Sequence, residues 1–165
     1  MVSPAREKIR VFVISSTEAL GIARELQSNF ERDNFFVEVW TDGVFKASNY
    51  LLEDLEKKVD DSDFAIAVAH SDDLTETRGS SKLTPRDNVI FELGLFVGRL
   101  GRQRSLLLEP RSEQVKLPSD LSGLTTISYQ YGKPDDLPSL LAPACHKIRK
   151  IINELGPRTI KWKYE

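Results

Sequence analysis

The sequence has few residues that can form covalent or metal cross-links. Its 165 residues include one cysteine, Cys145, and two histidines, His70 and His146. A single cysteine excludes an internal disulfide and is typical of a reducing compartment, so we expect a cytoplasmic protein. The set is too small for a structural zinc site, and we expect no metal. Cys145 and His146 are adjacent, which places them on different faces of a helix and argues against a Cys–His nucleophile pair.

The sequence also lacks a long apolar run and an excess of one charge. No apolar stretch approaches the ~20 residues of a membrane span, and the N-terminal segment is not typical of a signal peptide. Lys and Arg number 23 against 25 Asp and Glu, a net charge of −2, whereas nucleic-acid binders are usually basic. We therefore expect neither a membrane nor a nucleic acid as partner. The phosphate-binding patterns GxGxxG and GxxxxGK(S/T) are absent too, so neither of these nucleotide sites is indicated.

Short apolar segments alternate with segments of helical spacing, as in a globular α/β domain. The strand-like segments are 9–14, 35–40, 64–69, 105–108 and 125–131, and the helical ones are 18–32, 49–59, 84–100 and 137–155. This alternation predicts a flavodoxin-like, five-stranded parallel sheet of order 2-1-3-4-5 with helices on both faces. The polar stretch 70–83 is expected to be a loop. We expect one domain over 1–156, followed by a tail or linker over 157–165.

In such a sheet, ligands bind outside the carboxyl ends of the strands, next to the point where the strand order reverses. This rule selects polar and aromatic residues that follow the first three strands: Ser15, Ser16, Trp40, Asp42 and Asp72. The turn that begins at Ser15 offers backbone N–H groups to a phosphate, or it simply caps the next helix. Both interpretations stay open.

The segment 88–100, NVIFELGLFVGRL, contains one carboxylate, Glu92, among mainly apolar residues. Such a helix is hydrophobic nearly all round, so it is expected to be largely buried. A buried carboxylate is costly unless it is paired or faces a wet pocket. Glu92 is therefore either the structural partner of a base, Arg99 two turns on or another one, or a catalytic group in the crevice. Gly94 and Gly98 are expected to let this helix pack closely on the sheet.

Four stretches resemble the TIR-like effector domains of bacterial anti-phage systems of the CBASS, Pycsar and TIR–STING types. They are VWTDGVFKAS (39–48), SDFAIAVAHSDD (62–73), TPRDNVIFELGLFVGRLGR (84–102) and KLPSDLSGL (116–124), and the resemblance covers about 8–155. It implies a flavodoxin-like sheet and NAD⁺ hydrolase activity that is switched on by self-association through TIR–TIR contacts. It also implies a catalytic glutamate that matches Glu92, and a gating and assembly loop that matches Asp42–Ser48. NAD⁺ is then the substrate, no cofactor is expected, and a cyclic-nucleotide sensor domain lies on the same or another chain.

The chemistry of this reaction agrees with a single carboxylate. Cleaving the nicotinamide–ribose N-glycosidic bond expels a neutral leaving group, so the main requirement is opposite charge beside an oxocarbenium-like ribose. Trp40 and Phe45 either stack on a flat ring or pack, and Asp42 either binds ribose or begins a turn. At the start of the third helix, Arg86 and Asn88 contact phosphate or a neighbouring subunit, or only solvate the helix end.

The expected function is NAD⁺ depletion in anti-phage defence by an oligomerisation-activated hydrolase. The alternative is a non-catalytic scaffold that only assembles with other TIR domains. Glu92 distinguishes the two, because a scaffold does not require an acid inside an apolar helix.

Overall fold

The computed structural model describes residues 7–41, 51–70, 74–77, 80–83, 87–112 and 116–159. Seven strands and four α-helices follow one another along the chain, with three short 3₁₀ turns. They are β1 (Ile9–Ser15), α1 (Leu20–Asn29), β2 (Phe35–Thr41), α2 (Leu51–Asp61), β3 (Phe64–Val68), β4 (Leu74–Thr77), β5 (Ser80–Leu83), α3 (Asp87–Leu100), β6 (Ser105–Pro110), β7 (Thr125–Tyr129) and α4 (Leu137–Leu155).

Five strands form one sheet of order β2-β1-β3-β6-β7, and every neighbouring pair is parallel. Counted in chain order, these are the five strands predicted from the sequence, and the predicted order 2-1-3-4-5 is confirmed. All of β3 is buried, as expected for a central strand of a parallel sheet. The chain is an α/β protein of flavodoxin-like topology.

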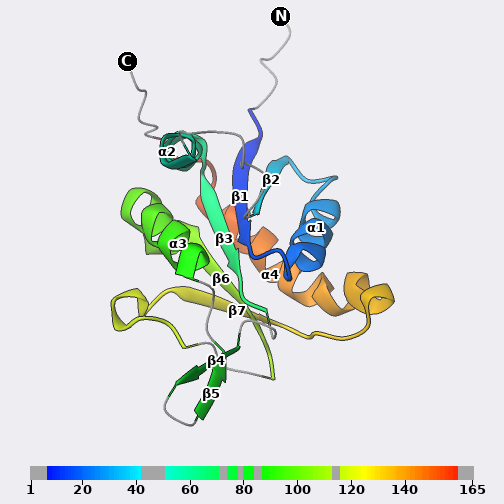
Figure 1. The fold of residues 1–165 in the computed structure, drawn as a ribbon. Helices are drawn as coiled ribbons and strands as arrows, with labels where there is room; N and C mark the ends of the chain where they lie inside the picture. Colours follow the sequence, from blue (N-terminus) through cyan, green and yellow to red (C-terminus); the bar gives the residue numbers. More distant parts are fainter. Residues whose placement is uncertain are drawn as a thin grey trace, which may run out of the picture.

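Helices cover both faces of the sheet (Figure 1). On one face α1 and α4 pack over a core that includes Val11, Val13 and Tyr129. On the other face α2 and α3 pack over Phe12 and Ile14. Successive residues of β1 therefore serve opposite cores, as the two-residue period of a strand requires.

The stretch 70–83, predicted as a loop, contains a hairpin, and that prediction is wrong. β4 and β5 pair antiparallel, with Leu74 opposite Leu83. The hairpin lies beyond the carboxyl ends of the sheet strands, at the bottom of Figure 1. Neither strand has the alternating apolar pattern on which the sequence prediction relied. The hairpin forms without that pattern because its ladder consists of backbone hydrogen bonds, which do not depend on the side chains.

Helix ends agree with the sequence in part. Helix α4 ends at Leu155, and Gly156 follows it with a φ of 67°. The Gly156 N–H donates to the Ile152 carbonyl at 2.8 Å. The first helix is shorter than the predicted 18–32, since α1 ends at Asn29. None of the helices in the described part of the chain is long and apolar enough to cross a bilayer.

Candidate active site

Helix α3 holds a carboxylate against the sheet. Its buried apolar side chains recur at helical spacing and face the α2/α3 core: Val89, Leu93, Phe96 and Leu100. Glu92 lies beside this row and is only 6 % exposed. The opposite face of the helix is open, because Phe91 is 54 % exposed. The expectation that the helix is largely buried therefore holds for one face only.

One hydrogen-bond partner of Glu92 is an aromatic side chain on β2. Trp40 Nε1 donates to Glu92 Oε1 at 3.1 Å, across 52 positions of sequence. Trp40 is 3 % exposed, so both groups are buried. A buried carboxylate needs such a donor, because burial without a partner strongly disfavours its charged form.

Arg99, the structural partner considered from the sequence, is paired elsewhere. Its Nε lies 3.0 Å from Asp60 Oδ1 at the end of α2. The contact is electrostatic, since its geometry is not that of a hydrogen bond. The interpretation of Glu92 as a partner of Arg99 finds no support in this arrangement.

One aromatic contact holds the Trp40 ring, and a second joins the same cluster to α3. The Phe12 and Trp40 ring centroids are 5.5 Å apart in a tilted arrangement, and the Phe12 and Phe96 rings stack at 5.0 Å. The indole therefore packs between the sheet and α3. Its burial agrees with the packing alternative for this residue, which the sequence had left open beside stacking on a ligand.

The two serines at the end of β1 have different environments. Ser16 Oγ accepts the Ala19 N–H at 3.3 Å in the turn that precedes α1, whose N-cap residue Ala19 has no side-chain capping hydrogen bond. Ser15 is buried, and its hydroxyl has no hydrogen-bond partner among the described residues. Ser15 follows Val11 and Val13 in the strand alternation, so its register places it on the α1/α4 face, whereas Glu92 lies on the α2/α3 face.

The remaining predicted site residues fall mostly outside the description. Asn88 is exposed at the start of α3, and its Oδ1 accepts the Val89 N–H at 3.2 Å. The other four, Asp42, Phe45, Asp72 and Arg86, lie outside the described residues.

A residue not selected from the sequence also lies at the carboxyl end of the sheet. His70 lies two residues after the end of the buried strand β3, is itself buried, and meets the Tyr131 ring edge-on at 5.0 Å. The neighbouring Tyr129 hydroxyl donates to the Ala69 carbonyl at 2.7 Å. The rule that ligands bind at the carboxyl ends of the strands also applies to His70. The sequence prediction selected the acidic residue Asp72 after this strand and did not select His70.

Two surface grooves lie away from Glu92. One, of about 280 Å³, runs between α2 and α3 and is lined in part by Gly94 and Gly98. A Cβ atom added at either glycine would meet nothing within 4 Å. The glycines therefore border open space, and the expectation that they allow close helix–sheet packing is wrong.

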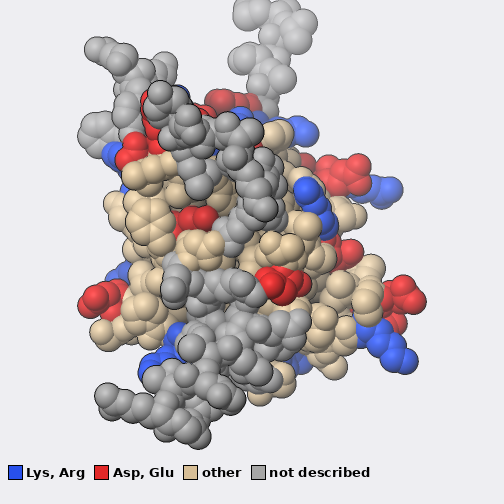
Figure 2. Space-filling model, in the orientation of Figure 1, with Lys and Arg blue, Asp and Glu red and all other residues tan. Residues whose placement is uncertain are grey.

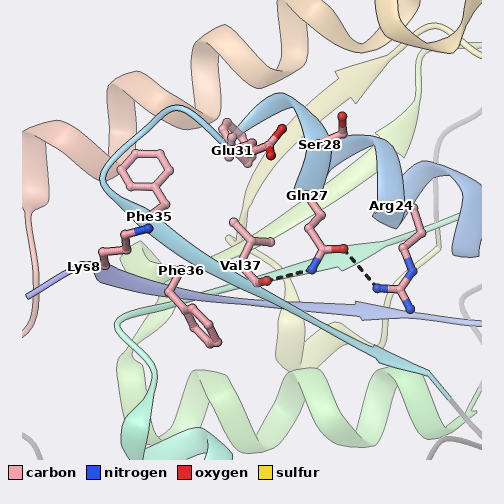
Figure 3. A pocket seen from close by; sticks show the side chains of 9 residues that line it. Lys8, Arg24, Gln27, Ser28, Glu31, Phe35, Phe36 and Val37 are labelled. Atoms are coloured by element: carbon pink, nitrogen blue, oxygen red, sulfur yellow. Dashed lines mark hydrogen bonds between the residues drawn. The ribbon is translucent and has the colours of Figure 1, made fainter.

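The other groove, of about 410 Å³, lies along the outer edge of β2 beside α1 (Figure 3). There Gln27 Nε2 donates to the Val37 carbonyl at 2.9 Å, and Gln27 Oε1 accepts from Arg24 at 3.0 Å. The side chain of Gln27 thus covers part of an edge strand. This polar covering is typical of a protected edge, and the groove contains no buried acid among its lining residues.

Charge and metal ligands give no other site in the described part of the chain. Basic and acidic side chains are interspersed around the described surface of the face shown in Figure 2. Among the described residues, no group of three or more His, Cys, Asp or Glu side chains is arranged to hold a metal ion. Among the described residues, the Trp40–Glu92 pair is therefore the candidate functional site.

The chain is similar to known proteins over most of its length. The family model of the CAP12/Pycsar effector protein TIR domain matches residues 10–131, which include both Trp40 and Glu92. The chain is 60 % identical over 159 residues to the Pycsar effector protein PaPycTIR of Pseudomonas aeruginosa, covering 96 % of this chain and 52 % of that protein. It is 56 % identical over 155 residues to BcPycTIR of Burkholderia cepacia, covering 94 % and 51 %.

A more distant relative has a different name. The CD-NTase-associated protein 12 of Flavobacterium daejeonense is 40 % identical over 149 residues, which are 89 % of this chain and 46 % of that protein. The chain spans about half the length of the curated relatives it matches.

Proposed function

The chain belongs to the CAP12/Pycsar effector TIR domain family, and from this premise we propose that it hydrolyses NAD⁺ in anti-phage defence. The observation that carries the proposal is Glu92, a carboxylate buried on an apolar helix and hydrogen-bonded by Trp40 at 3.1 Å. An acid kept in such a place at a cost in stability is typical of a functional site.

The reaction uses water and no other co-reactant. The bond between ribose C1′ and the nicotinamide nitrogen breaks, and its electron pair neutralises the pyridinium. Water adds through its oxygen to C1′ and loses a proton to solvent, so the products are nicotinamide, ADP-ribose and H⁺. The Glu92 carboxylate supplies the charge opposite to the oxocarbenium-like ribose, and low-dielectric surroundings strengthen that attraction.

Self-association is the switch in this proposal. The segment Asp42–Ser48 begins one residue after β2, the strand that carries Trp40. A neighbouring subunit that contacts this segment only in the active conformation of the site would shift the population toward that conformation. The relatives are called Pycsar effectors and CD-NTase-associated proteins, which supports a cyclic-nucleotide sensor domain as the source of the signal.

Nicotinamide release from NAD⁺ tests the proposal. Initial rates are measured by chromatography over about two decades of enzyme concentration, for the chain alone and for the chain fused to an oligomerising domain. We expect the rate to rise more steeply than linearly for the chain alone, and to be high at all concentrations for the fusion. Absence of nicotinamide in both forms would leave the non-catalytic scaffold as the function. A strictly proportional rate with no gain from fusion would contradict the assembly switch alone.

A further inference from the structure

We propose that Trp40 is a positioning residue for Glu92, whose indole N–H fixes the orientation of the carboxylate toward the reacting ribose. The proposal rests on the proposed function, because it assigns a role within the same site. It differs from the stacking role considered from the sequence, since Trp40 acts through Glu92 and not through contact with substrate.

The type of donor is the first argument. The Trp40 N–H is neutral and lies 3.1 Å from Oε1, so it satisfies one carboxylate oxygen without adding a positive charge. A Lys or Arg in its place would offset the negative charge that a cationic transition state needs. A neutral donor therefore gives the carboxylate a hydrogen bond without placing a full positive charge beside it.

The rigidity of the donor is the second argument. The backbone of Trp40 is paired in the sheet opposite Ile14, and its ring is 5.5 Å from Phe12. Phe12 also stacks on Phe96, which lies one helical turn after Glu92. The sheet and α3 are thus joined at two neighbouring points, a polar one on β2 and an aromatic one on β1. Such a shell holds a reacting group to within a fraction of an ångström.

The substitution Trp40→Phe removes the N–H and keeps an aromatic ring. We expect kcat to fall about ten- to hundredfold, with KM changed less than about threefold, because orientation is lost while substrate contacts are kept. Phe30→Leu is the matched control, since it disturbs a buried aromatic pair with Phe35 in the opposite core and leaves the shell around Trp40 and Glu92 intact. Its kcat should stay within about threefold of wild type, with thermal unfolding measured for both variants.

An NMR measurement tests the contact without any activity. The chain has two tryptophans, Trp40 and Trp162, so Trp162→Phe leaves a single indole ¹H–¹⁵N resonance. In that background, Glu92→Leu should move the Trp40 indole resonance and speed its exchange with solvent. Glu53→Gln, on the exposed surface of α2, should leave both unchanged.

The outcomes separate this inference from the proposed function. Absence of NAD⁺ cleavage by the clustered wild type would overturn the proposed function and with it the role of Trp40, even if the indole resonance still reports the contact. Cleavage by wild type combined with an unchanged kcat and a raised KM in Trp40→Phe would overturn the positioning role and favour substrate contact. Equal losses of kcat in Trp40→Phe and Phe30→Leu would show that a general packing defect explains the loss, and would reduce Trp40 to a packing residue. If the position and the solvent exchange of the Trp40 indole resonance are unchanged in Glu92→Leu, the hydrogen bond itself is refuted.

Discussion

Asp63→Ala removes the carboxylate that ties the end of α4 to the amino edge of the sheet. Asp63 is fully buried between α2 and β3. Its Oδ2 accepts the Arg10 N–H and its Oδ1 accepts the Arg158 N–H, each at 2.9 Å. Arg104 lies beside it and donates to the Gly156 carbonyl at 2.7 Å. One side chain therefore joins β1, β3 and the segment that follows α4.

The loss can be estimated from these contacts. The substitution leaves two backbone N–H groups without their acceptor, at about 1–3 kcal/mol each where they stay buried. It also removes a counter-charge: burial lowers the pKa of both the Arg104 and the Arg158 guanidinium, and Asp63 acts in the opposite direction on each. Both arginines are only partly buried, so solvent screens this second contribution. We expect the free energy of unfolding to fall by about 3–5 kcal/mol, a large part of the about 5–15 kcal/mol typical of a domain.

Urea unfolding followed by circular dichroism measures this loss. Asp61→Ala is the matched control, because Asp61 is exposed at the end of α2, and its effect should stay within about 0.5 kcal/mol. Hydrogen exchange at the Arg158 amide gives a local reading, which should speed up in Asp63→Ala. A loss below about 1 kcal/mol, with Arg158 exchange unchanged, would refute the argument that Asp63 holds this junction together.

Three further predictions concern other parts of the chain. Gly98→Ala should raise the free energy of unfolding by about 0.5–1 kcal/mol in urea titrations, because the new Cβ meets nothing within 4 Å and alanine favours helix; a loss would show hidden crowding. Burial raises the pKa of the Cys145 thiol to about 12, above its ordinary 9.0. The folded state therefore favours the protonated thiol, and the contribution of this thiol to the free energy of unfolding is complete below pH 9 and is lost between pH 9 and pH 12. Wild type should thus lose about 1 kcal/mol more than Cys145→Ala between pH 8 and pH 10, and parallel pH curves would contradict this. Phe45→Asp should weaken sedimentation-detected self-association and NAD⁺ cleavage together, whereas no change in either would show that the segment Asp42–Ser48 is only a connection.

The sheet could be predicted because its strands have a strong sequence pattern. The run Phe64–Val68 is apolar throughout, and only a central parallel strand buries both faces in this way. Alternation of strands and helices then determines the parallel topology. The hairpin β4–β5 could not be predicted in the same way, because the polar segments Leu74–Thr77 and Ser80–Leu83 contain no apolar alternation.

The error at Gly94 and Gly98 has a related cause. Spacing shows that two residues share a helix face, but not which neighbour that face meets. The sheet-facing stripe of α3 includes Val89, Leu93 and Phe96, and this stripe leaves the glycines on the side of the groove next to α2. Only the packing of α2 beside α3 reveals that side as open.

The candidate acid was visible in the sequence, but its partner was not. Glu92 was singled out because a lone carboxylate in an apolar helix needs an explanation. Its nearest basic residue in the helix, Arg99, was considered as a partner because helical neighbours can be counted. The contact with Trp40 crosses 52 residues and depends on how α3 packs on the sheet, which a single sequence does not specify.

The rate of nicotinamide release by Glu92→Gln under enforced clustering tests the central claim most directly. Gln has the same shape and can still accept from the Trp40 N–H, so the fold and the thermal unfolding should match those of wild type. The variant lacks the negative charge, and its rate should fall at least about a hundredfold, to the background of NAD⁺ alone. A clustered, folded Glu92→Gln protein that releases nicotinamide at nearly the wild-type rate would contradict the account.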